Sequence, residues 1–204
     1  MRHLTDFFKR SRKRGFPMIS AVFDACVFYS ASLRDFLLRL AEDKLVDPFW
    51  SEEIQKEWID SLLQNRPDLK RENLERTCRE MDVHFPRSLV RGYESILPGL
   101  TLPDPNDRHV LAVAIRMKTK YIVTFNLKDF PKTILQSYGI VAVSPDHFIF
   151  QLIQESPYFV LRTVKRHRLG LARPPKTVDE YLATLEKQGL GKTISFLREH
   201  EAEM

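Results

Sequence analysis

Acidic and amide side chains follow two apolar runs of the chain. Asp24 comes directly after the run at residues 18–23, and Asn126 and Asp129 follow a second run at residues 121–125. Both runs are short and rich in β-branched residues, which is typical of buried parallel strands. Because ligands of an open α/β sheet bind beyond the carboxyl ends of its strands, we expect these side chains to share one rim.

Three acids on intervening helices are predicted to reach the same rim. Asp104 and Asp107 begin the helix that leads into the second strand, and a helix start lies on the edge where the preceding strand ends. Glu57 lies beside the apolar stripe of a helix predicted for residues 51–64, so its side chain is expected to point into a cleft. Each acid also has a structural explanation, of which the N-cap role of Asp104 is the clearest.

Carboxylates collected at one rim repel one another unless protons or a cation neutralise them. Oxygen ligands suit Mg²⁺ or Mn²⁺, and Mg²⁺ commonly bridges one or two carboxylates to a substrate phosphate. Such an ion lowers the pKa of an attacking water and stabilises charge on the leaving oxygen. The acids therefore predict an enzyme that hydrolyses phosphodiester bonds.

The order of the predicted elements indicates an α/β fold. Strands predicted at residues 18–23, 121–125 and 139–143 alternate with amphipathic helices. This alternation implies right-handed crossovers and a parallel sheet flanked by helices. One of these helices is predicted to begin at Ser32, with Asp35 completing a capping box. From residue 144 onward only helical patterns occur, so we expect a helical C-terminal extension.

The distribution of charge along the 204 residues sets the N-terminal segment apart. Residues 1–17 carry six basic side chains and one acid, which accounts for the whole formal charge of +5. We predict a basic leader there, disordered or able to bind phosphates, then a catalytic domain at 18–155 and the extension at 156–204. No apolar stretch is long enough for a membrane helix, so we expect a cytoplasmic protein without a membrane partner.

Four segments in this order resemble the motifs of PIN-domain nucleases. They are FDACVF at 23–28, the helix start at 51–57 that contains Glu57, DRHVLAVA at 107–114, and TFNLKDF at 124–130. The resemblance spans residues 19–149 and extends to the VapC-like toxins of bacterial toxin–antitoxin pairs. The basic leader and the helical extension depart from the minimal toxins.

The resemblance implies a metal-dependent ribonuclease with a PIN-like sheet, Mg²⁺ or Mn²⁺ as cofactor, RNA as substrate and a small antitoxin protein as partner. Matched by position, three acids would bind the metal and a fourth would complete the catalytic set. The metal ligands are Asp24, Glu57 and Asp107; the fourth acid is Asp129; the supporting residues are Thr124, Asn126 and Asp104.

Other interpretations share these residues. A non-catalytic PIN-like module would bind RNA or protein without cutting, but it has no physical reason to keep mutually repelling acids. A structure-specific DNA nuclease would need a longer insertion. The C-terminal helices also allow a homodimer. Candidate RNA contacts, with a solvated helix face as the alternative for those beyond residue 160, are Arg108, Arg162, Lys165, Arg166 and Arg168.

Overall fold

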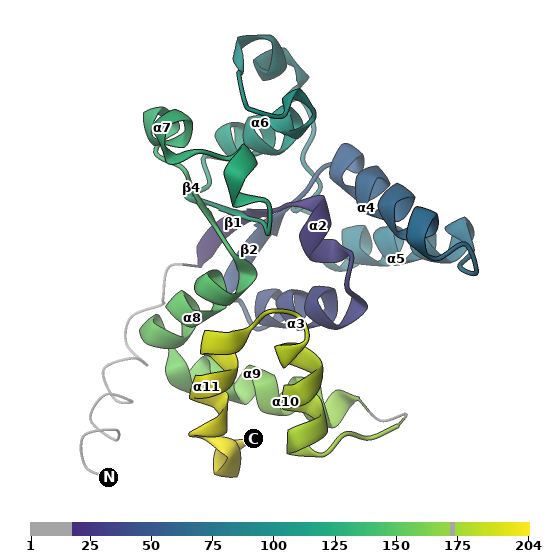
Figure 1. The fold of residues 1–204 in the computed structure, drawn as a ribbon, viewed down its shortest axis with the longest axis vertical. Helices are drawn as coiled ribbons and strands as arrows, with labels where there is room; N and C mark the ends of the chain where they lie inside the picture. The colour runs from purple at the N-terminus through teal and green to yellow at the C-terminus, as the bar shows by residue number, and fades with distance from the viewer. Residues whose placement is uncertain (1–17, 172–173) are drawn as a thin grey trace.

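A four-stranded parallel sheet forms the centre of the protein in a computed structural model (Figure 1). The structure describes residues 18–171 and 174–204, so the predicted basic leader lies outside the described residues. The strand order is β2–β1–β3–β4, which confirms the predicted α/β class. The strands are β1 (Ile19–Phe23), β2 (Val46–Phe49), β3 (Tyr121–Val123) and β4 (Val141–Val143).

Helices cover both faces of this sheet. The α-helices are α2 (Ala25–Phe28), α3 (Ala31–Glu42), α4 (Glu52–Asn65), α5 (Arg71–His84), α6 (Arg108–Met117), α7 (Lys132–Leu135), α8 (Pro145–Glu155), α9 (Pro157–Gly170), α10 (Val178–Glu186) and α11 (Gly191–Arg198). Short 3₁₀ turns are η1 (Glu94–Gly99), η2 (Pro105–Asp107), η3 (Leu127–Asp129), η4 (Gln136–Tyr138) and η5 (Glu201–Glu203). In Figure 1, α6 lies above the strands, whereas α3 and α8 lie below them.

Burial explains why the first apolar run becomes the central strand. Val22 and Phe23 are fully buried, and Phe23 packs edge-on against Phe148 of α8, with ring centroids 6.1 Å apart. Strand β2 contains Pro48, which has no N–H to donate, and it is accommodated because β2 lies at the edge of the sheet. The predicted strands 121–125 and 139–143 are present but shorter.

One predicted helix start is wrong. Helix α3 begins at Ala31, because the hydroxyl of Ser30 accepts the amide of Leu33 and Ser30 has the extended backbone of an N-cap. Ser32 is already helical. Asp35 does not complete a capping box with it; its carboxylate lies 2.8 Å from Nε2 of His167.

The C-terminal helices pack onto the sheet domain. Helix α9 contacts α3 and α8, and α11 contacts α8 and α10. Asp146, at the start of α8, accepts the amides of Lys192 and Thr193 at 3.0 and 2.9 Å, which caps α11. The predicted helical C-terminal region is thus confirmed, while the domain boundary at residue 155 stays a prediction. Within the described ranges, no helix is both long and apolar enough to cross a membrane.

Candidate active site

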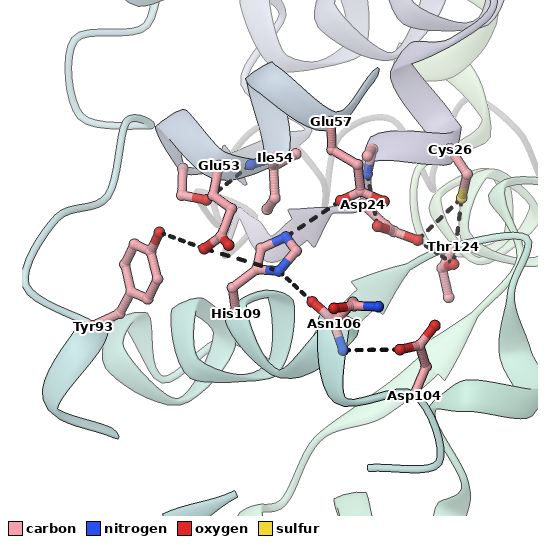
Figure 2. A network of polar contacts seen from close by, with 12 residues as sticks. Asp24, Cys26, Glu53, Ile54, Glu57, Tyr93, Asp104, Asn106, His109 and Thr124 are labelled. Atoms are coloured by element: carbon pink, nitrogen blue, oxygen red, sulfur yellow. Dashed lines mark hydrogen bonds and ion pairs between the residues drawn. The ribbon is translucent and has the colours of Figure 1, made fainter. Parts of the chain in front are cut away.

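Asp24 is held at the carboxyl end of β1 by three donors. It is the N-cap of α2, and its Oδ1 accepts the amide of Ala25 at 2.7 Å. Its Oδ2 accepts the hydroxyl of Thr124 at 2.6 Å and the thiol of Cys26 at 3.1 Å (Figure 2). Asp24 is only 4% exposed. Because a carboxylate has about four lone-pair sites, one site on Oδ1 is left for a further ligand.

Thr124 and Asn126 hold this arrangement from the neighbouring strand. Thr124 directly follows β3, is fully buried, and its amide donates to the carbonyl of Val143 in β4. Its hydroxyl donates to Asp24 and accepts the amide of Asn126 at 2.9 Å. Both residues therefore lie where a supporting role needs them, although Asn126 uses its backbone for this contact.

Cys26 remains a thiol in this environment. Burial, followed by the charge of Asp24, raises the pKa of the Cys26 thiol to about 12. Its sulfur donates to Asp24 and accepts the amide of Phe125 at 3.3 Å. A thiol this far from ionisation is a poor nucleophile, so we assign Cys26 a structural role beside Asp24.

Glu57 and Asp107 complete the predicted acidic rim, and the charges interact strongly. Burial, followed by the charges of Asp24 and Asp107, raises the pKa of Glu57 from 4.5 to about 7. Burial, followed by the charge of Asp24, raises the pKa of Asp107 from 3.8 to about 7. Asp104 and Asp129 add smaller contributions to the pKa of Asp107. The structure thus brings all five predicted acids within electrostatic reach of one another.

Asp107 is the acid whose side chain most clearly lacks a partner. It is 7% exposed and occupies the N-cap of α6, yet its side chain makes no capping hydrogen bond. Among the described residues, its Oδ2 is buried without any hydrogen-bond partner. An unpaired buried carboxylate oxygen is costly, and a hard cation such as Mg²⁺ would satisfy it. The donor set therefore fits the metal that the sequence predicts.

The acids do not form a complete metal cage by themselves. No three acidic, histidine or cysteine side chains within residues 18–171 and 174–204 are already arranged around one ion. Mg²⁺ usually keeps several water ligands and uses only one or two carboxylates. Asp24 offers one free lone pair and Asp107 one buried, unpaired oxygen, so these two acids can serve as direct ligands.

Asp104 and Asp129 lie at the margin of the rim. Asp104 caps the turn η2, because its Oδ1 accepts the amide of Asn106 at 2.8 Å. The predicted N-cap role of Asp104 is therefore observed. Its charge also contributes to the raised pKa of Glu57. Asp129 ends η3 and is half-buried. Both acids act on the rim through their charge.

His109 is a site residue to which the sequence assigned no role. It is 5% exposed, and its Nε2 lies 3.5 Å from Oε2 of Glu57 (Figure 2). Its Nδ1 lies 2.7 Å from the carbonyl of Asn106, and because a carbonyl only accepts, Nδ1 carries the proton. Among the described residues, Nε2 is buried without a hydrogen-bond partner, and it faces the carboxylate of Glu57. His109 is two residues from Asp107, and residues two apart on a helix point in different directions. The sequence spacing therefore did not indicate that both lie at the site.

A groove runs from Glu57 between α4 and the start of α6. Its volume is about 480 Å³, and Lys56 and Arg108 line it. The Nε of Arg108 donates to the carbonyl of Pro105, so the predicted RNA contact Arg108 lies beside the rim with its position fixed. The remaining lining residues are Glu53, Asp60, Ser61, Gln64, Leu97, Pro105, Asn106 and His109.

The other predicted cations lie on α9, away from this rim. Arg166 forms an ion pair with Asp43, which is the C-cap of α3. Asp43 precedes the amino end of β2, whereas Asp24 lies at the carboxyl end of the parallel strand β1. Arg168 donates to two backbone carbonyl groups of the C-terminal region. Arg162 and Lys165 are exposed on the same helix. Contacts between this cluster and RNA stay a prediction.

Comparison with known proteins identifies the family. The PIN domain family model matches residues 20–128, more than half of the chain, and the chain belongs to this family. A second model, the VapC50 C-terminal domain, matches residues 145–199. A curated protein of Mycobacterium tuberculosis, named "Putative ribonuclease VapC50", is 54% identical over 43 residues, which is 21% of this chain and 25% of that protein. The match thus spans a quarter of the relative's length. No solved structure matches the chain.

The raised pKa of Asp107 predicts that stability depends on pH in metal-free protein. Its folded-state pKa lies above its unfolded value, so its contribution to stability is full below about pH 4 and is lost as the pH rises through 7. Asp107→Asn cannot ionise. In chelator at pH 8 we therefore expect this variant to be more stable than the wild type, by on the order of 1 to 3 kcal/mol.

Urea unfolding between pH 4 and pH 8 measures this difference. The matched control is Asp179→Asn, because the Asp179 side chain is 84% exposed at the start of α10. We expect the advantage of Asp107→Asn to grow with pH, while the control follows the wild type. A wild-type stability that rises with pH relative to Asp107→Asn would contradict the assignment.

Proposed function

We propose that the protein is a Mg²⁺- or Mn²⁺-dependent endoribonuclease that hydrolyses RNA phosphodiester bonds. The observation that carries this proposal is the buried, unpaired Oδ2 of Asp107 among carboxylates that repel one another. Membership of the PIN domain family supports it, as does similarity to a relative whose name describes a ribonuclease. RNA is the substrate class that this similarity favours.

Each residue of the rim has a role in this proposal. Asp24 and Asp107 would hold the ion, and Glu57 would be the third acid around it. Thr124 fixes the orientation of Asp24 through its 2.6 Å hydrogen bond, and Asp129 adds negative charge at the margin. When bound, the ion would make a water more acidic and stabilise charge on the leaving oxygen.

Asp24→Asn tests the assignment with little disturbance of the fold. Asn is also a good N-cap, so it can still accept the amide of Ala25 and keep α2 in place. It loses the negative charge that attracts a cation. We expect Mn²⁺-dependent cleavage of total RNA to fall by roughly 100-fold or more, with an unchanged circular dichroism spectrum.

Sequencing of the RNA ends, with and without Mn²⁺, identifies the cut sites, and single-stranded DNA is included as a second substrate. The control is Glu52→Gln, because Glu52 lies on the same helix as Glu57 but is exposed and pairs with Arg91 at 2.7 Å. Full activity in well-folded Asp24→Asn would refute the site. Preferential cleavage of DNA would refute the substrate class.

We further propose that the nuclease is the toxin of a type II toxin–antitoxin system and acts in the cytoplasm. Similarity to VapC50 over the C-terminal region supports this extension. A ribonuclease that cuts cellular RNA needs restraint, and a basic side chain inserted among the rim acids would displace the cation. A small antitoxin protein is therefore the expected partner, and the C-terminal helices offer a further surface for it or for a second copy of the chain.

Co-expression with the product of the neighbouring open reading frame, where the antitoxin is expected, tests the partner. We expect the two proteins to purify together and the complex to cut RNA at least about ten-fold more slowly than the free enzyme. Light scattering of each sample gives the stoichiometry and shows whether the chain dimerises. An active chain that cells tolerate freely, and that is recovered alone, would contradict the toxin role but not the nuclease.

A further inference from the structure

Phe125 is an exposed aromatic side chain beside the acidic rim. Phe125 is 47% exposed, whereas every other phenylalanine in the described parts of the chain is buried or half-buried. It directly follows Thr124, whose hydroxyl holds Asp24. Single exposed apolar side chains are common on protein surfaces. What distinguishes Phe125 is its position next to the residues that orient Asp24.

Hydrogen bonds fix the backbone on both sides of the ring. The amide of Phe125 donates to the sulfur of Cys26 at 3.3 Å, and the amide of Asn126 donates to the hydroxyl of Thr124 at 2.9 Å. These contacts tie the Phe125 backbone to the same cluster that orients Asp24. The backbone that carries the ring is thus fixed next to the rim.

The C-terminal region supports one edge of the ring. Gly189, in the turn between α10 and α11, has a φ of +77°, and its Cβ position would lie 3.8 Å from Cε1 of Phe125. This proximity places the α10–α11 turn next to the exposed ring. The helical extension therefore reaches the margin of the active site.

A nucleobase is the ligand that suits this ring. Single-stranded RNA presents unpaired bases, and aromatic side chains bind such bases by stacking. The phenylalanine side chain has no hydrogen-bonding group, so it would stack on any base without selecting its identity. Lys128, in the turn η3 that follows, is exposed and adds a positive charge that suits a neighbouring phosphate.

We propose that Phe125 is the stacking platform for the base next to the cleaved phosphate of a single-stranded RNA. The inference rests on the proposed ribonuclease function and assigns a substrate subsite to it. An apolar side chain of a partner protein is the competing occupant. The base is favoured because the backbone of Phe125 is hydrogen-bonded to Cys26 and lies between Thr124 and Asn126 in the chain. A base attached to a phosphate at the rim lies in the same neighbourhood.

The test uses short single-stranded RNAs that carry 2-aminopurine at successive positions, because stacking on an aromatic ring quenches its fluorescence. Binding is measured in the Asp24→Asn protein, in which cleavage is expected to be lost. Phe125→Leu removes the aromatic face but keeps apolar bulk, and Phe125→Trp restores a face. We expect Leu to weaken binding by roughly ten-fold and to abolish quenching at one position, and Trp to restore both.

An exposed aromatic side chain near the amino ends of the strands provides the control, because Phe125 lies at their carboxyl ends. Tyr138 is 41% exposed and lies at the end of η4, before β4 begins. Tyr138→Leu should bind the same RNAs as the parent protein. In proteins that keep Asp24, Phe125→Leu should raise the KM for RNA by roughly ten-fold and change kcat less.

The outcomes separate this inference from the proposed function. Quenching that depends on Phe125, together with a wild type that cuts no RNA, would support base stacking on Phe125 while refuting the ribonuclease. A wild type that cuts RNA, with unchanged KM and unchanged quenching in well-folded Phe125→Leu, would overturn the platform. Loss of partner-protein binding in Phe125→Leu, with RNA binding intact, would overturn it as well.

Discussion

Repulsion among partly buried carboxylates is the constraint on which the rest of the site depends. Glu57 and Asp107 each have a pKa raised to about 7, because burial and neighbouring charges disfavour their ionised forms. Near neutral pH each acid is therefore protonated about half of the time when no cation is present. A divalent ion would replace those protons, and the unpaired Oδ2 of Asp107 is the most direct structural sign of its place.

The parallel sheet creates this constraint by bringing distant segments together. Asp24 ends β1 and Thr124 follows β3, and these adjacent strands place the two side chains 2.6 Å apart across one hundred residues of sequence. Because parallel strands end at the same edge, helices α4 and α6 add Glu57 and Asp107 there. The same edge also receives the α10–α11 turn, so the C-terminal region contributes to the surroundings of the site.

Local patterns predicted three of the strands and the acids of the rim. A short apolar run followed by an acid involves only residues that are adjacent in the sequence, so it can be recognised without the structure. The N-cap Asp104 was readable for the same reason. Strand β2 was missed because its Pro48 is tolerated only at a sheet edge, which the sequence does not reveal. Ser30 and Ser32 are equally good caps in isolation. The roles of His109 and Phe125 arise from contacts with other elements, so no local pattern indicates them.

Proton release on metal binding tests the central claim most directly. Calorimetric titration with Mn²⁺ at about pH 7, in buffers of different ionisation enthalpy, gives the number of protons released per ion bound. Because two acids of the rim are each about half protonated there, the account predicts a release of about one proton, falling towards zero at pH 9 and decreasing in Asp107→Asn. Binding without proton release at pH 7, or an equal release from Asp107→Asn, would contradict it.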